Sequence, residues 1–130
     1  MNVQSKKTGT KGGLFKCVNA SADLSNVTIS GCNLSGTSRR AIDIVANKLT
    51  NFIINGNGLK DLGQQQASIK IAVDTVKGLR VDMNNISENT YSKAIEIAAN
   101  TVLGKNSMLF NSAETGVFEA PEQFNTQGNW

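Results

Sequence analysis

The stretch Ser68-Ile69-Lys70-Ile71-Ala72-Val73 decides the fold of this 130-residue chain, because altered copies of its centre recur at a nearly fixed spacing. Ile42-Asp43-Ile44 begins 27 residues before Ile69-Lys70-Ile71, and Ile95-Glu96-Ile97 begins 26 residues after it. Phe15-Lys16-Cys17 lies a further 27 residues before the first of these. In each copy two apolar residues flank one charged residue, which is the alternation of a strand with one buried face. A period near 26 predicts a solenoid of stacked coils.

A second pattern lies between the copies of the first and repeats with them. Its three versions are Leu24-x-x-Val27-x-Ile29-x-x-Cys32-x-Leu34, Leu49-x-x-Phe52-x-Ile54-x-x-Asn57-x-Leu59 and Val76-x-x-Leu79-x-Val81-x-x-Asn84-x-Ile86. This alternation points Val27, Ile29 and Leu34 inward and stacks their equivalents about 4.8 Å apart. Asn57 and Asn84 would then lie one above the other, their amides satisfying backbone groups where the chain turns. Cys32 interrupts that ladder at its first position.

The run Asn26-Val27-Thr28-Ile29-Ser30, followed by Asn33-Leu34, gives the chain a family resemblance. Over about residues 14–102 it resembles the right-handed parallel β-helix, or pectin-lyase-like, superfamily. The resemblance implies an all-β fold, a right-handed parallel β-helix of about four coils with a C-terminal capping tail. We expect residues 1–13 to be a flexible arm or truncated coil, 14–112 to form the coils, and 113–130 to be the capping or oligomerisation tail.

The leucine-rich repeat, an α/β solenoid, fits the same second pattern, including a cysteine at the position of Cys32. It would make residues 40–48, 67–75 and 93–101 helical. Residues two apart in a helix point to nearly opposite sides, so each Ile-charge-Ile copy would expose one isoleucine. A strand buries both isoleucines. The sequence therefore favours the β-helix, with the leucine-rich repeat as the alternative.

The composition, 39% hydrophobic and 18% charged, is that of one soluble globular domain. Aromatic residues make up only 5%, the net charge is +3, and no basic stripe with stacking aromatics is visible, so we expect no nucleic-acid partner. No apolar run is long enough for a signal peptide or a membrane span, which predicts cytoplasmic synthesis without a leader and no membrane contact. Cys17 and Cys32 are expected to remain separate thiols.

The chain contains no histidine, which removes the commonest general base and the usual zinc sites. We therefore expect no metal site and no cofactor. The first outward constellation is the column Lys16, Asp43, Lys70, Glu96. Asp43 and Glu96 would lie two coils apart, about 9.6 Å at the usual strand spacing, near the upper limit for carboxylates that invert a glycosidic bond. Lys70 between them favours a charge ladder on an exposed sheet instead.

The second outward constellation is Thr28, Ile53 and Arg80 beside Ser30, Asn55 and Asp82. It resembles the catalytic face of pectate lyases, which hold calcium with acidic residues and use an arginine as base. Only Arg80 and Asp82 match in type, and calcium would need more oxygen ligands than Asn55 and Asp82 supply. The candidates for catalysis are thus Asp43, Glu96, Arg80 and Asp82, and those for ligand binding are Asn55, Arg80 and Asp82.

These patterns favour a non-catalytic structural or recognition module. The resemblance implies a segment of a phage tail spike or a similar surface-binding protein, located in a virion tail and contacting polysaccharide. The alternatives are a fragment of a polysaccharide depolymerase, either a lyase or a glycoside hydrolase, and a leucine-rich-repeat module that binds protein. The aromatic residues Phe110, Phe118, Phe124 and Trp130 near the end of a short stack predict a homo-oligomer, a trimer by resemblance to tail spikes.

Overall fold

A computed structural model describes residues 4–9, 14–37, 40–60 and 66–130 of the chain. These residues contain strands and turns and no helix. The segments that a leucine-rich repeat would make helical lie in or at the start of β5 (Ile42–Asn55), β7 (Ile69–Asp82) and β9 (Lys93–Leu103). The leucine-rich-repeat alternative is therefore wrong, because burying both isoleucines of each copy requires the period of a strand.

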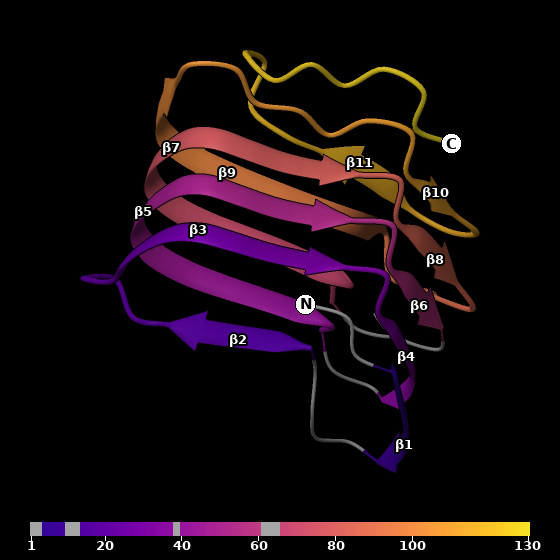
Figure 1. Ribbon diagram of the computed structural model, residues 1–130. Coiled ribbons are helices and arrows are strands. Elements are labelled where there is room, and N and C mark those ends of the chain that lie inside the picture. Colours follow the sequence, from indigo (N-terminus) through magenta and orange to yellow (C-terminus); the bar gives the residue numbers. More distant parts are fainter. Residues whose placement is uncertain (1–3, 10–13, 38–39, 61–65) are drawn as a thin grey trace.

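The described strands form two parallel sheets that run side by side along the stack (Figure 1). The long strands β5, β7 and β9 form the centre of one sheet, which β11 (Val117–Glu119) extends at one edge and β2 (Phe15–Val18) and β3 (Asp23–Ser30) extend at the other. The short strands form the second sheet in the order β1 (Gln4–Gly9), β4 (Asn33–Thr37), β6 (Gly58–Lys60), β8 (Asn85–Ser87) and β10 (Ser112–Ala113). The chain alternates between the sheets, so the fold is a parallel β-helix of about four coils, as expected.

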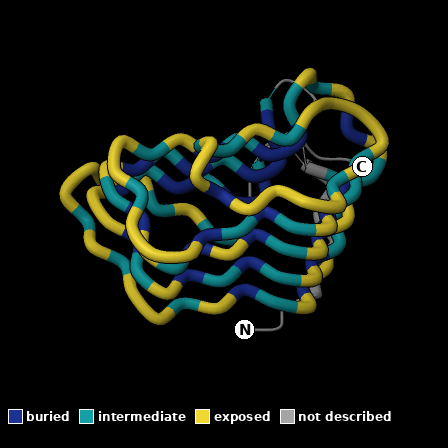
Figure 2. The backbone as a smooth tube through the Cα atoms, turned by 90° about the horizontal axis from the view of Figure 1, so that it is seen from above, coloured by how far each residue is buried: buried dark blue, intermediate teal, exposed yellow. Residues whose placement is uncertain are grey.

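The register of the sheets follows the sequence repeat. Ile42 pairs with Ile69 and Ile69 pairs with Ile95, while the charged residues between the isoleucines pair in the same order. Six isoleucines form one buried wall, each 3% exposed or less: Ile42, Ile44, Ile69, Ile71, Ile95 and Ile97. Figure 2 shows the buried segments recurring at equivalent places in successive coils. The core is thus a column of stacked, mainly aliphatic side chains that also contains Phe52.

A ladder of asparagines lines the corner between the second half of each long strand and the short strand that follows. Asn84 Oδ1 accepts the backbone N–H of Asn57 at 3.1 Å and the Asn57 side-chain amide at 2.9 Å. The Asn84 amide in turn donates to the carbonyl of Ile54 and to Asn111 Oδ1. Cys32 occupies the first position, where its backbone N–H donates to Asn57 Oδ1 at 2.9 Å. The predicted Asn57–Asn84 contact is confirmed, and Cys32 has no amide with which to begin the ladder.

The ladder extends beyond the residues that the repeat revealed. Asn111 donates its amide to Asn129 Oδ1 at 2.9 Å and to the carbonyl of Val81 at 2.7 Å. Asn129 donates to the carbonyls of Met108 and Thr126. The chain after residue 112 therefore continues the stack with a shorter coil.

The C-terminal tail, residues 113–130, covers part of the last long coil. Phe124 is 5% exposed and belongs to the core, and Phe118 packs against it from β11. Phe110 and Trp130 remain exposed at 52% and 70%. The described part of the expected N-terminal arm, residues 4–9, forms β1 and pairs in parallel with β4, whereas residues 1–3 and 10–13 lie outside the described residues.

The residue before each ladder position adopts a left-handed backbone conformation. Its φ is +61° at Gly31, +66° at Gly56, +57° at Met83, +54° at Phe110 and +72° at Gly128. Glycine adopts this conformation without steric cost, whereas a residue with a Cβ is strained by about 1–2 kcal/mol. The corner therefore stores strain in the two coils that carry Met83 and Phe110.

We expect Gly56→Ala to lower the free energy of unfolding by about 1 kcal/mol, because a Cβ there meets open space and only the backbone conformation is penalised. The reverse change, Met83→Gly, should raise stability by up to about 1 kcal/mol, since the Met83 side chain is 56% exposed and contributes little packing. Urea unfolding of both variants, with Met83→Ala as the near-neutral control, measures these changes. An unaltered midpoint for Gly56→Ala would contradict the strain at this corner.

Candidate functional site

The first candidate constellation is the charged column on the outer face of the long sheet. Lys16 pairs in register with Asp43, Asp43 with Lys70, and Lys70 with Glu96, as the sequence predicted. Glu119 on β11 adds a fifth position opposite Glu96. The carboxylates are held in ion pairs: Arg40–Asp43 at 3.4 Å, and Lys70–Glu96, Lys93–Glu96 and Lys93–Glu119 each at 3.2 Å.

Ion pairing with Lys93 and Lys70 lowers the pKa of Glu96. Partial burial raises the pKa of Glu96, but the hydrogen bonds and positive charges of Lys93 and Lys70 outweigh it and hold the pKa below its ordinary value. The pKa of Lys93 in the same cluster is raised, most by its hydrogen bond to Glu119 and next by its hydrogen bond to Glu96. A general acid in glycoside hydrolysis needs a raised pKa, so Glu96 is poorly suited to that role. With Lys70 between Asp43 and Glu96, this column is better suited to tying neighbouring coils together.

The second constellation lies on the outer face of the second half of the long strands. Thr28, Ile53 and Arg80 are in register in adjacent coils, and so are Ser30, Asn55 and Asp82. Arg80 and Asp82 line a hollow of about 580 Å³. We name this hollow the Arg80 groove; its lining residues are Arg80, Asp82, Gly104, Lys105, Asn106, Ser107, Leu109, Gln123 and Asn125.

The groove arises where the fourth coil departs from the repeat. Ser107 pairs with Arg80, 27 residues earlier, and the amide of Asn106 turns inward so that its Oδ1 accepts the Leu79 N–H at 2.8 Å. Gly104 and Lys105 lie outside this inward turn and are exposed. The tail supplies the remaining side of the groove, because Asn125 pairs with Ser107. Three segments far apart in the sequence thus meet at one polar hollow.

Hydrogen bonds inside the groove occupy its carboxylate. Both oxygens of Asp82 accept the Ser107 hydroxyl, at 2.9 and 3.1 Å, and Oδ1 also accepts the Leu109 N–H at 3.0 Å. Asn55 lies beside Asp82 one coil earlier without lining the groove, and its buried Oδ1 has no hydrogen-bond partner among the described residues. Two of the three predicted ligand residues, Arg80 and Asp82, therefore share a hollow.

The repeat pattern could not identify the other lining residues. Lys105, Ser107, Gln123 and Asn125 follow Val102, after which the apolar spacing no longer matches the preceding coils. The change from apolar to polar residues is the signal in the sequence that marks this region as different, while the 27-residue spacing from Arg80 to Ser107 is kept.

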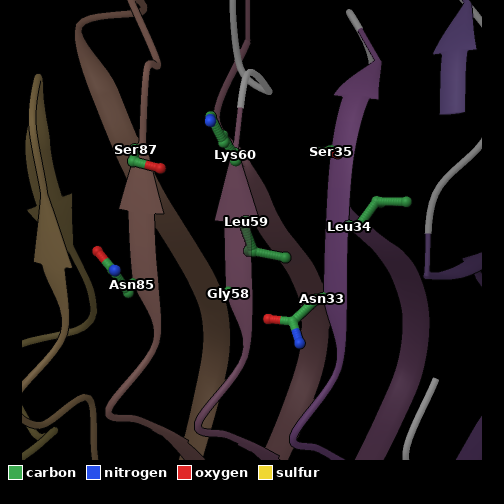
Figure 3. Close-up of a pocket in the computed structure, with 8 residues that line it drawn as sticks. All are labelled: Asn33, Leu34, Ser35, Gly58, Leu59, Lys60, Asn85 and Ser87. Atoms are coloured by element: carbon green, nitrogen blue, oxygen red, sulfur yellow. The ribbon is translucent and has the colours of Figure 1, made fainter. Parts of the chain in front are cut away.

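A smaller hollow of about 260 Å³ lies on the outer face of the short sheet. Figure 3 shows the side chains of Asn33 and Asn85 on either side of Gly58, where an added Cβ would collide with Asn33 Oδ1. Lys60 borders the hollow but is engaged by Glu88 at 3.6 Å. This hollow is open, and it is the second candidate contact surface.

Two further classes of site are absent from the described ranges. No cluster of three or more metal-ligating side chains occurs in residues 4–9, 14–37, 40–60 and 66–130, and no helix there could cross a membrane. Comparison with protein-family models, curated proteins and solved structures finds no match to this chain. The geometry of the β-helix and its hollows is therefore the basis for assigning a function.

Proposed function

We propose that this chain is a structural and recognition module of a surface-binding protein of the phage tail-spike kind, and that it contacts polysaccharide through the Arg80 groove. The observation that carries the proposal is the groove itself, in which amide, hydroxyl and cationic side chains from β7, residues 104–109 and the tail converge. Sugar hydroxyls both donate and accept hydrogen bonds, which Asn125, Gln123 and Ser107 can match. The volume of about 580 Å³ lies within the usual range of ligand sites.

Recognition fits the groove better than catalysis. Among the described residues Asp82 is the only carboxylate that lines it, and two donors, the Ser107 hydroxyl and the Leu109 N–H, hold that carboxylate in place. A general base must reach the proton that it abstracts, and an acceptor already occupied by its neighbours is poorly placed for this. The stacked coils instead provide a rigid support for binding, since β7 carries Arg80 and Asp82, and Ser107 and Asn125 are held beside it by β-bridges.

A panel of bacterial surface polysaccharides tests this proposal by biolayer interferometry on the intact protein. We expect saturable binding of at least one polymer and about a tenfold loss of affinity in Asn125→Ala, because one hydrogen bond to the ligand is removed. Asn85→Ala, on the short sheet, is the matched control and should bind normally. Loss of binding in Asn85→Ala alone would move the contact to the smaller hollow, and release of reducing ends or unsaturated products would contradict a non-catalytic module.

We further infer that copies of the chain associate, with a trimer as the expected state by analogy with tail spikes. Val117 and Trp130 are 56% and 70% exposed, and both line a hollow of about 460 Å³ near the last coil. Exposed apolar side chains gathered in this way are typical of an interface between subunits. Closed symmetric association would cover them.

Sedimentation of the intact protein should show an oligomer. Replacing both Val117 and Trp130 with serine should yield folded monomers, because both side chains are exposed in the single chain. Their unfolding midpoint should no longer depend on protein concentration. Phe124→Ser is the contrasting control: it removes a core side chain that is 5% exposed and should destabilise the fold by about 3 kcal/mol or more. An intact protein that sediments as a monomer at micromolar concentration would contradict this association.

A further inference from the structure

The charges that line the Arg80 groove are not balanced within the chain. Arg80 and Lys105 are both exposed there, and neither forms an ion pair with a carboxylate in the part of the chain that the structure describes. Elsewhere, four cations are engaged by carboxylates: Arg40, Lys60, Lys70 and Lys93. The groove thus combines two available cations with a preformed hollow.

Asp82 does not cancel this surplus by pairing with Arg80. Its two oxygens face the Ser107 hydroxyl and the Leu109 N–H, at distances from 2.9 to 3.1 Å. Because these contacts occupy the Asp82 carboxylate, the guanidinium of Arg80 and the ammonium of Lys105 are the charged donors of the groove. The side chains that line it carry one negative and two positive charges in all, a net charge of +1.

The two cations suit one kind of ligand group. A guanidinium presents a planar fork of N–H donors that matches two oxygens of a carboxylate, sulfate or phosphate, and a lysine adds a mobile point charge. The amides of Gln123 and Asn125 and the hydroxyl of Ser107 lie in the same lining, where they can bind the uncharged hydroxyls beside that group.

We propose that the ligand of the Arg80 groove is anionic: a polymer that carries carboxylate, sulfate or phosphate groups, one of which is bound between Arg80 and Lys105. This inference rests on the proposed function. It restricts the ligand of the groove to polymers that carry negative charge. The groove is open to solvent, so a chain segment can enter it without threading through a closed pocket.

Four polymers on the intact protein distinguish the sources of the anionic group: alginate for carboxylate, dextran sulfate for sulfate, poly(glycerol phosphate) for phosphate, and uncharged dextran. We expect at least one charged polymer to bind, with several-fold weakening between 50 and 200 mM salt, because two charge contacts release few counterions. Arg80→Gln should weaken that binding about tenfold or more and Lys105→Gln about threefold to tenfold, whereas Arg80→Lys should retain part of it.

The matched control is Lys16→Gln, which removes the same charge from an exposed position on β2 outside the groove. Equal weakening by Lys16→Gln and Arg80→Gln would overturn the inference, because binding would then follow net charge. Salt-independent binding of an uncharged polymer that Asn125→Ala weakens would also overturn it while leaving the proposed function in place. Failure of every charged and uncharged polymer to bind would count against both. Unfolding midpoints of the variants confirm that each protein is folded.

Discussion

The structure depends on satisfying backbone polar groups where each coil turns inward, and the asparagine ladder meets that constraint. A buried amide or carbonyl without a partner costs about 1–3 kcal/mol. Each ladder residue forms hydrogen bonds with several such groups. Asn84 Oδ1 accepts the backbone N–H and the side-chain amide of Asn57, and the Asn84 amide donates to the Ile54 carbonyl and to Asn111 Oδ1. Since Asn57, Asn84 and Asn111 are 27 residues apart, the ladder also fixes how much chain each of these coils contains.

The strand pattern and the middle of the ladder could be predicted from sequence because both rest on local rules. Alternation identifies the buried face of Ile69-Lys70-Ile71 without knowledge of its neighbours, and a repeated asparagine identifies a repeated turn. Asn111 was not identified because polar Asn106 stands where the apolar pattern needs an equivalent of Leu79, although the 27-residue spacing continues. Asn129 was not identified because the last coil is only 18 residues long. The strain at Met83 and Phe110 was likewise invisible, since bulky residues give no sequence signal of a left-handed backbone. For the candidate site, sequence placed Arg80 beside Asp82, but the hollow also needs Lys105 and Asn125, which lie after the apolar pattern ends at Val102.

The two outward charged faces differ in how their charges are used. On the first half of the long strands, Lys70, Lys93, Glu96 and Glu119 neutralise one another across successive coils. On the second half, the Asp82 carboxylate accepts hydrogen bonds from Ser107 and Leu109 of the next coil and forms no ion pair with Arg80 among the described residues. The groove on the second face is lined by the fourth coil, where the apolar pattern ends, and by the tail. The proposed recognition role thus depends on the part of the chain that departs from the repeat.

The most direct test of the account compares Asn84→Ala with Asn85→Ala by urea unfolding. The two asparagines are adjacent in sequence, but Asn84 is 1% exposed in the ladder, whereas Asn85 is exposed and accepts only the Ser112 hydroxyl among the described contacts. We predict that Asn84→Ala lowers the free energy of unfolding by about 3 kcal/mol or more, because several buried partners lose their hydrogen bonds, and that Asn85→Ala changes it by no more than about 0.5 kcal/mol. Equal stability of the two variants would contradict the ladder as the interaction that holds the coils in register.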